Sequence, residues 1–155
     1  MKEAVNSAPG SAVKILDATW RDLRDLYTLE KACFEQDSWS LWDVLGVLTF
    51  PEIIRLKADL DDQLVGFIAG DLRQSQHSAW IATFGVLPAF RRQGIGSRLL
   101  KTCESRLTVS SLRLSVRASN QPAIQLYQEH GYSQVNTWPH YYRGNEDALI
   151  FEKHL

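Results

Sequence analysis

Apolar residues recur along this chain with two different spacings, and each spacing predicts one kind of element. Alternation with a period of two predicts strands, and recurrence every three to four residues predicts helices. The first spacing predicts a sheet of six to seven strands, with candidate segments at 12–18, 52–59, 64–73, 78–87, 111–118, 132–138 and 146–155. The second spacing predicts four helices, at 19–34, between Ser40 and Pro51, at 94–107 and at 120–130.

The residues at the predicted helix ends support these limits. Thr19 is a candidate N-cap, and Asp22 three residues later fits a capping box. Ser40 can cap the second helix, which Pro51 then ends because proline cannot continue a helix. Gly131 is the residue type that favours the stop of the last helix.

The order of the elements predicts the fold class. The pattern is βαα, then three strands, then two αβ pairs and a final strand, which indicates an α/β (α+β) fold with a mixed, mostly antiparallel sheet and helices on its faces. A chain of 155 residues has the usual length of one domain. We expect residues 1–11 to be a flexible lead-in and residues 12–155 to form a single domain.

Composition and charge exclude several classes of function. The chain is 45% hydrophobic and 23% charged, as in ordinary globular proteins, and its net charge is −1. That balance provides no general field for nucleic acid or an anionic membrane. No run reaches the ~20 apolar residues of a membrane span. Cys33 and Cys103 are too few for a disulfide framework and lack metal-site spacing, so we expect no metal and a cytoplasmic location.

The segment RRQGIG, residues 91–96, lies where a predicted strand ends and a predicted helix begins. Taken alone it is either a basic surface turn or a site where helix amides, glycines and arginines bind a pyrophosphate. A Walker loop would need Gly-Lys-Ser/Thr at its end, and a dinucleotide fingerprint would need a third glycine where the chain has Leu99. Neither of those motifs is present.

Two longer stretches resemble one family. "FGVLPAFRRQGIGSRLL" resembles the acetyl-coenzyme A loop of the GNAT superfamily of N-acetyltransferases, and "LRLSVRASNQPAIQLYQEHGY" resembles the strand and helix that follow it. The resemblance covers roughly residues 12–155 and agrees with the element order. It implies the GNAT fold, acetyl-coenzyme A as the cofactor, and acetyl transfer by direct attack of a primary amine on the thioester.

A narrower resemblance concerns the acceptor. "HYYRGNEDALIFEKHL" and "ACFEQDSWS" are similar to segments of N-terminal protein acetyltransferases, and the RimI-like bacterial enzymes, which acetylate the N-terminal alanine of a ribosomal protein, are the closest group. This implies a protein or peptide N-terminus as the acceptor, a ribosomal protein among the candidates, and a monomer or weak dimer. Two alternatives stay open: an acyl-coenzyme A-binding module with little catalysis, and a small-molecule amine acetyltransferase.

The resemblance also assigns roles to individual residues. It implies that the general acid is Tyr127, which would protonate the departing thiol. The residues it implies for cofactor binding are Phe84, Gly85, Val86, Arg91, Arg92, Gln93, Gly94, Ile95, Gly96, Ser97, Asn120 and Tyr127. Those implied for the acceptor are Glu35, Trp39, His140, Tyr141 and Tyr142.

One position departs from the family. RimI-like enzymes usually have Glu in the strand before Arg-x-Ser-Asn, and this chain has Ser115 there. A related position that is Tyr in some relatives is Phe90. Neither residue is a base at neutral pH. The open explanations are a base acting through water (His140, Glu35 or Asp37), an acceptor that arrives neutral, and weak catalysis.

Overall fold

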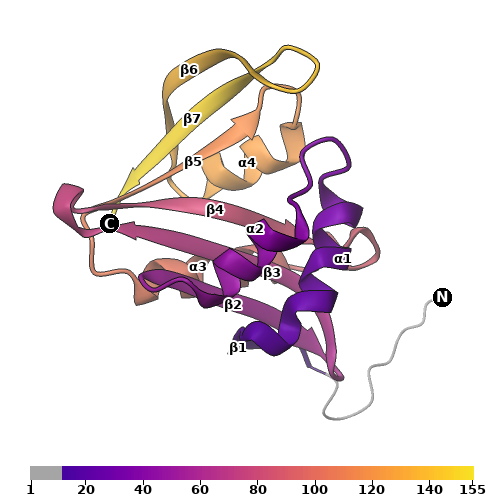
Figure 1. Cartoon of the computed structure of the whole chain (residues 1–155). Helices are drawn as coiled ribbons and strands as arrows, with labels where there is room; N and C mark the ends of the chain where they lie inside the picture. The colour runs from indigo at the N-terminus through magenta and orange to yellow at the C-terminus, as the bar shows by residue number, and fades with distance from the viewer. Residues whose placement is uncertain (1–11) are drawn as a thin grey trace.

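The computed structural model describes residues 12–155 and contains one sheet with helices on both faces (Figure 1). The predicted lead-in at 1–11 lies outside the described residues. The strands are β1 (Lys14–Asp17), β2 (Ile53–Leu60), β3 (Gln63–Arg73), β4 (Ser78–Val86), β5 (Ser111–Arg117), β6 (Ser133–Tyr142) and β7 (Glu146–His154). Their order in the sheet is β1-β2-β3-β4-β5-β7-β6, and only β4 and β5 are parallel neighbours. The predicted mixed, mostly antiparallel sheet is confirmed.

Four α-helices connect the strands, as predicted. They are α1 (Leu23–Cys33), α2 (Leu41–Thr49), α3 (Ile95–Arg106) and α4 (Gln121–Glu129). The predicted capping box of Thr19 with Asp22 forms, and Ser40 caps the second helix as predicted, in a box with Asp43 that we did not predict. The Thr19 box starts a short 3-10 turn, Trp20–Asp22, so the α-helix itself begins four residues after the predicted cap. None of the described helices is long and apolar enough to cross a membrane.

The two faces of the sheet carry different helices. On one face, α3 and α4 bury Leu99, Leu100 and Tyr127 against strand residues such as Leu112 and Leu114. On the opposite face, α1 and α2 bury a second cluster around Leu26, Val44 and Phe67, over the β2–β4 half of the sheet (Figure 1). The β5–β7 half of this second face carries Arg113, Ser115 and Arg117, because strand residues alternate between faces.

Strands β4 and β5 pair over three residues and then separate. Ser78, Ala79 and Trp80 face Ser111, Leu112 and Arg113, and beyond these pairs β4 continues to Val86 and β5 to Arg117 without contact in the ladder. A register shift between β3 and β4 leaves Ala82 as an extra residue, and such a bulge bends a strand. Figure 1 shows the resulting V, with β4 along one arm and β5, β7 and β6 along the other.

Strand β6 is longer than the predicted 132–138 segment. It runs to Tyr142, but its register against β7 shifts between Trp138 and Tyr142, so four steps of β6 span two steps of β7, from Ala148 to Glu146. Within that shift His140 has a left-handed φ of 54°. The alternation pattern fails at this bulge, which is why the sequence did not predict a strand there.

The alternation of β5 provides a test of the core. Leu114 is 1% exposed, whereas its neighbour Arg113 points to the other face and pairs with Glu152 at 2.7 Å. We expect Leu114→Ala to cost about 2–5 kcal/mol of unfolding free energy, and Arg113→Ala about 0–1 kcal/mol, because exposed ion pairs contribute little. Urea unfolding followed by circular dichroism measures both. Equal losses would contradict the assignment of faces.

Candidate active site

The separation of β4 from β5 leaves one edge of β4 open. The amide of Leu87 donates to the carbonyl of Val65 in β3, at 2.8 Å. Because successive residues of a strand direct their backbone groups to alternate sides, the amides and carbonyls of Val86 and Phe84 face the gap. An extended chain that carries amides can pair with such an edge.

Two side chains bind the Val86 carbonyl from this side. Arg91 Nε donates to it at 2.8 Å, and the Cys33 thiol donates at 3.4 Å. Burial raises the pKa of the Cys33 thiol, so Cys33 remains a donor at neutral pH. Arg91 is thus partly engaged at the end of β4, and Cys33 is a contact that sequence reasoning missed, since nothing in its surroundings along the chain marks it.

The start of α3 fits an anion. No side chain caps the helix, so the amides of Ile95, Gly96 and Ser97 have no partner within it and lie at the positive end of its dipole. Gly94 has φ +81°. Apart from Gly94 and its two chain neighbours, no heavy atom of residues 12–155 lies within 4 Å of the point where a Cβ would stand, so the surface above it is open. These features suit a pyrophosphate group.

The other predicted loop residues divide into two kinds. Arg92 and Gln93 are exposed, and Arg92 has a left-handed φ of 64°. Ile95 is buried, so only its backbone can contact a ligand. A Cβ on Gly96 would lie 3.6 Å from the Phe84 ring, so the helix start packs closely against β4.

Tyr127 of α4 is buried among aromatic rings, and its hydroxyl has no hydrogen-bond partner among residues 12–155. It contacts Phe84, Tyr132 and Phe151, with ring centroids 5.9–6.3 Å apart. Burial raises its pKa well above the ordinary value for tyrosine, so the hydroxyl keeps its proton. A buried hydroxyl without a partner is costly, and a ligand in the gap would supply the partner.

Asn120 begins α4 as its N-cap. Its side-chain oxygen accepts from the amide of Ala123 at 3.3 Å. The side-chain NH2 group makes no hydrogen bond within the described part of the chain, so it is available to a ligand.

A cavity of about 410 Å³ opens between α1, the start of α4 and the end of β5. Its lining is mostly polar and comes from three separate segments of the chain, at 33–37, at 117–120 and at 146. The lining residues are Cys33, Phe34, Glu35, Gln36, Asp37, Arg117, Ser119, Asn120 and Glu146.

Arg117 joins these three segments. It makes two hydrogen bonds to the Asp37 carboxylate, at 2.7 and 2.9 Å, and one to Glu146 at 2.7 Å. It also donates to the carbonyl of Arg143 and lies 4.8 Å from the centre of the Tyr142 ring. The hydrogen bonds to Asp37 raise the pKa of Arg117, and bonds from Ser119 and Arg117 lower that of Glu146. The loop after α1 and the β6–β7 hairpin are therefore held together across the cavity.

At Ser115, where a base is expected, the structure has a hydrogen-bonded pair of neutral side chains, Ser115 and Tyr142. The Tyr142 hydroxyl donates to Ser115 Oγ at 3.0 Å. Burial raises the pKa of Tyr142, partly opposed by this hydrogen bond, so the phenol is neutral near pH 7. Ser115 thus has a partner, and within residues 12–155 no carboxylate or imidazole is hydrogen-bonded to its side chain.

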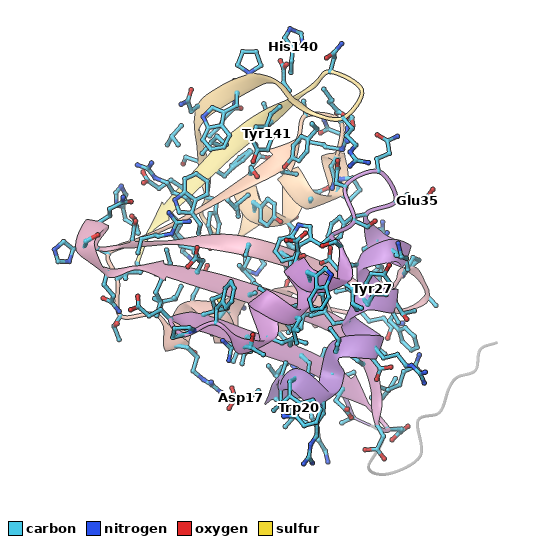
Figure 2. All side chains as sticks on the ribbon, viewed as in Figure 1. Asp17, Trp20, Tyr27, Glu35, His140 and Tyr141 are labelled. Atoms are coloured by element: carbon cyan, nitrogen blue, oxygen red, sulfur yellow. The ribbon has the colours of Figure 1, made fainter. Side chains whose placement is uncertain are left out.

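The remaining predicted acceptor residues lie at different places (Figure 2). Glu35 is exposed on the cavity rim, Trp39 is half-buried and Tyr141 is 56% exposed. His140 projects from the top of the molecule, and its Nδ1 lies 3.1 Å from the carbonyl of Asn145 within its own hairpin. The structure therefore does not bring His140 to the cavity as a relayed base.

Sequence reasoning also missed a buried carboxyl. Glu30 of α1 is 1% exposed, accepts a hydrogen bond from the Thr83 hydroxyl of β4, and is bonded by the backbone of Trp39. Burial raises the pKa of Glu30. Its contacts explain how α1 is fixed to β4 and how the loop with Trp39 is oriented. Among residues 12–155, no group of three or more His, Cys, Asp or Glu residues could hold a metal ion.

Comparison with known proteins agrees with this geometry. A family model described as "Acetyltransferase (GNAT) family" matches residues 16–132. N-alpha-acetyltransferase 50 of Danio rerio is 31% identical over 151 residues, covering 92% of this chain and 89% of the relative. The ribosomal protein bS18-alanine N-acetyltransferase of Salmonella typhimurium is 34% identical over 103 residues, covering 63% of this chain and 68% of the relative.

A solved structure shows the same architecture. The crystal structure of the ribosomal-protein-S18-alanine N-acetyltransferase from Escherichia coli superposes with a TM-score of 0.85 at 26% identity, covering 92% of this chain and 94% of that one. The family match extends over the gap between β4 and β5, the 91–96 loop and the helix with Tyr127. The chain therefore belongs to the GNAT family, as an acetyl-coenzyme A-dependent N-acetyltransferase.

Proposed function

We propose that the acceptor is the N-terminal α-amine of a protein or peptide. The observation that carries this proposal is the hydrogen bond from Tyr142 to Ser115, which places a neutral pair where a base is expected. An α-amine with a pKa of about 7.7–8.0 is roughly 10% neutral at pH 7, whereas a lysine side chain is neutral to only ~0.04%. A site without a strong base therefore favours α-amines by a few hundred-fold. The relatives named as N-alpha-acetyltransferase and bS18-alanine N-acetyltransferase support the same choice.

The residues of the gap are suited to holding acetyl-coenzyme A. We assign the pyrophosphate to the amides at the start of α3, with Arg91, Arg92 and Gln93 beside them. We assign the pantetheine amides to the open edge of β4 at Phe84 and Val86. Gly85 lies between these two residues, but its own backbone is directed to Phe67 of β3, so it does not pair with the cofactor as expected. The cofactor supplies an acetyl group activated as a thioester. Asn120 and Tyr127 lie at the opposite side of the gap, where the sulfur end would be placed.

Tyr127 is then the general acid. Its raised pKa keeps the proton on the hydroxyl throughout the physiological pH range, and the hydroxyl has no other described partner. The hydroxyl can donate a hydrogen bond to the departing sulfur as the C–S bond breaks. Because its raised pKa lies above the ordinary thiol pKa of ~8.5, proton transfer requires that the sulfur be held in the same desolvated gap, where burial raises the pKa of the thiol as well.

On the acceptor side we assign backbone contacts of the peptide to Tyr141 and Tyr142, and contacts near its N-terminus to Glu35 and Trp39. A ribosomal protein is one acceptor to test, because the Salmonella relative is named for one. We propose a cytoplasmic monomer or weak dimer.

The first prediction concerns the acceptor. A peptide with a free N-terminal Ala or Ser and no lysine should be acetylated, whereas one with a blocked N-terminus and an internal lysine should react at least about 100-fold more slowly. Below the α-amine pKa, kcat/KM should rise about ten-fold per pH unit and level off above roughly pH 8, because only the neutral amine attacks. Mass spectrometry and initial rates measure both.

Three results would contradict this proposal. Faster reaction of the lysine peptide, or modification of a polyamine but no peptide, would assign a different acceptor. Tight binding of acetyl-coenzyme A without turnover of any amine would favour a binding module.

The second prediction concerns Tyr127. Tyr127→Phe keeps the ring contacts but removes the hydroxyl, so we expect kcat to fall about 10²- to 10⁴-fold with little change in cofactor affinity. Tyr132→Phe is the matched control, because that buried ring contacts Tyr127 while its hydroxyl bonds to Glu104 at 2.7 Å. Initial-rate assays measure kcat, and isothermal titration calorimetry measures the affinity for the cofactor. A Tyr127→Phe protein with more than half of the normal kcat would exclude the general-acid role.

A further inference from the structure

An aromatic surface lies beside the acceptor side of the cavity. It consists of Trp80 from β4 and Trp138 and Tyr141 from β6, and we call these three residues the aromatic surface. The rings of Trp80 and Trp138 stack with centroids 5.7 Å apart and an interplanar angle of 26°. The ring centroids of Trp138 and Tyr141 are 5.2 Å apart. Tyr141 remains 56% exposed, and the two tryptophans are partly exposed.

The register of the sheet places this surface on the acceptor face. Trp80 is paired with Arg113, and Trp138 with Ala148, which in turn is paired with Arg117. Paired residues share a face, so these rings lie on the same face as Ser115. That is the half of the face that α1 and α2 leave uncovered.

The surface is continuous with the reacting end of the gap. Tyr141 contacts Tyr142 with centroids 5.1 Å apart, and Tyr142 is bonded to Ser115. Along β5, Ser115 is two residues from Arg113, the partner of Trp80. Two strand residues span about 6.6 Å, which is also the length of two residues of an extended peptide. A peptide whose amine lies near Ser115 can therefore reach the rings with its second or third side chain.

The charges that border the surface are already compensated. Asp71, the partner of Trp80 in β3, is paired with Arg73 at 2.9 Å. Arg113 is paired with Glu152, and Arg117 with Asp37 and Glu146. No uncompensated charge among these neighbours favours a charged occupant, whereas stacked indole rings favour apolar or aromatic contact.

We propose that the aromatic surface selects acceptors with an apolar side chain at the second or third residue. This inference rests on the proposed function and narrows its substrate class. The occupant is a leucine-, methionine- or phenylalanine-like side chain of the acceptor peptide itself, seated on Trp138 and Tyr141. Burial of such a side chain stabilises the complex over one with serine at the same position.

A pair of peptide series tests the proposal. One series has the form Ala-X-Ser and the other Ala-Ser-X, with X as Leu, Phe, Ser or Asp. We expect kcat/KM for Leu or Phe to exceed that for Ser by about ten-fold in at least one series, with Asp lowest. Trp138→Ala and Tyr141→Ala should each reduce that ratio, Trp138→Ala to near unity, while Trp138→Phe keeps most of it.

The ratio of kcat/KM for the Leu or Phe peptide to that for the Ser peptide is informative, because a general loss of folded enzyme lowers both values equally. Tyr141 is exposed, so its variant should fold even if the Trp138→Ala protein does not. Trp42→Ala is the matched control, since Trp42 is 77% exposed on α2 and takes part in neither of the ring pairs that form the aromatic surface. Absence of any apolar preference in the native enzyme, or a ratio unchanged in Trp138→Ala and Tyr141→Ala, would overturn the inference. Failure to acetylate every peptide would instead contradict the proposed function.

Discussion

The early end of the pairing between β4 and β5 is the constraint on which the site depends. Three residue pairs join the strands, and the extra residue at Ala82 then bends β4 away. A closed sheet would satisfy the backbone of Phe84 and Val86 and leave no path through the sheet. The open sheet exposes the backbone of Phe84 and Val86 to a ligand. Residues from both faces of the sheet can then reach the same gap. Helices α3 and α4 approach the gap from one face, and Ser115 and Tyr142 approach it from the other. The chemistry can therefore draw on two binding surfaces that do not compete for space.

The open edge requires support from neighbouring elements, and polar contacts of buried and partly exposed side chains provide it. Glu30 bonds to Thr83 from α1, Cys33 and Arg91 bond to Val86, and Arg117 holds the loop after α1 against β7. Each contact joins segments that the sheet alone would leave separate. Unpaired buried groups are costly, so these partners also favour one geometry of the gap over alternatives. The same reasoning makes the buried Tyr127 hydroxyl informative, because residues 12–155 provide no hydrogen-bond partner for it.

Much of the fold follows from local sequence, whereas the residues assigned to the cofactor come from the resemblance to the GNAT family. Period-two runs predicted the strands, and the capping box at Thr19 and the N-cap at Ser40 form as expected. The glycine loop lies at a helix start because Gly94 and Gly96 suit that position. The acceptor end was less predictable, because its contacts join residues far apart in the chain. The Arg117–Asp37 pair spans 80 positions, and the bulge in β6 that presents Tyr141 and Tyr142 breaks the alternation on which strand prediction relies. The sequence shows that Ser115 stands where related enzymes usually have a base. Its hydrogen bond with Tyr142 could be found only in the structure.

We propose that cofactor and acceptor reach the gap from opposite faces of the sheet and meet within it. Isothermal calorimetry with a conjugate that joins an acceptor peptide to coenzyme A through an acetyl bridge tests this claim directly. The two halves would bind at once, so the conjugate should bind at least about 100-fold more tightly than coenzyme A alone. A conjugate that binds no more tightly than coenzyme A would contradict the claim, because the two ligands would then not share the gap.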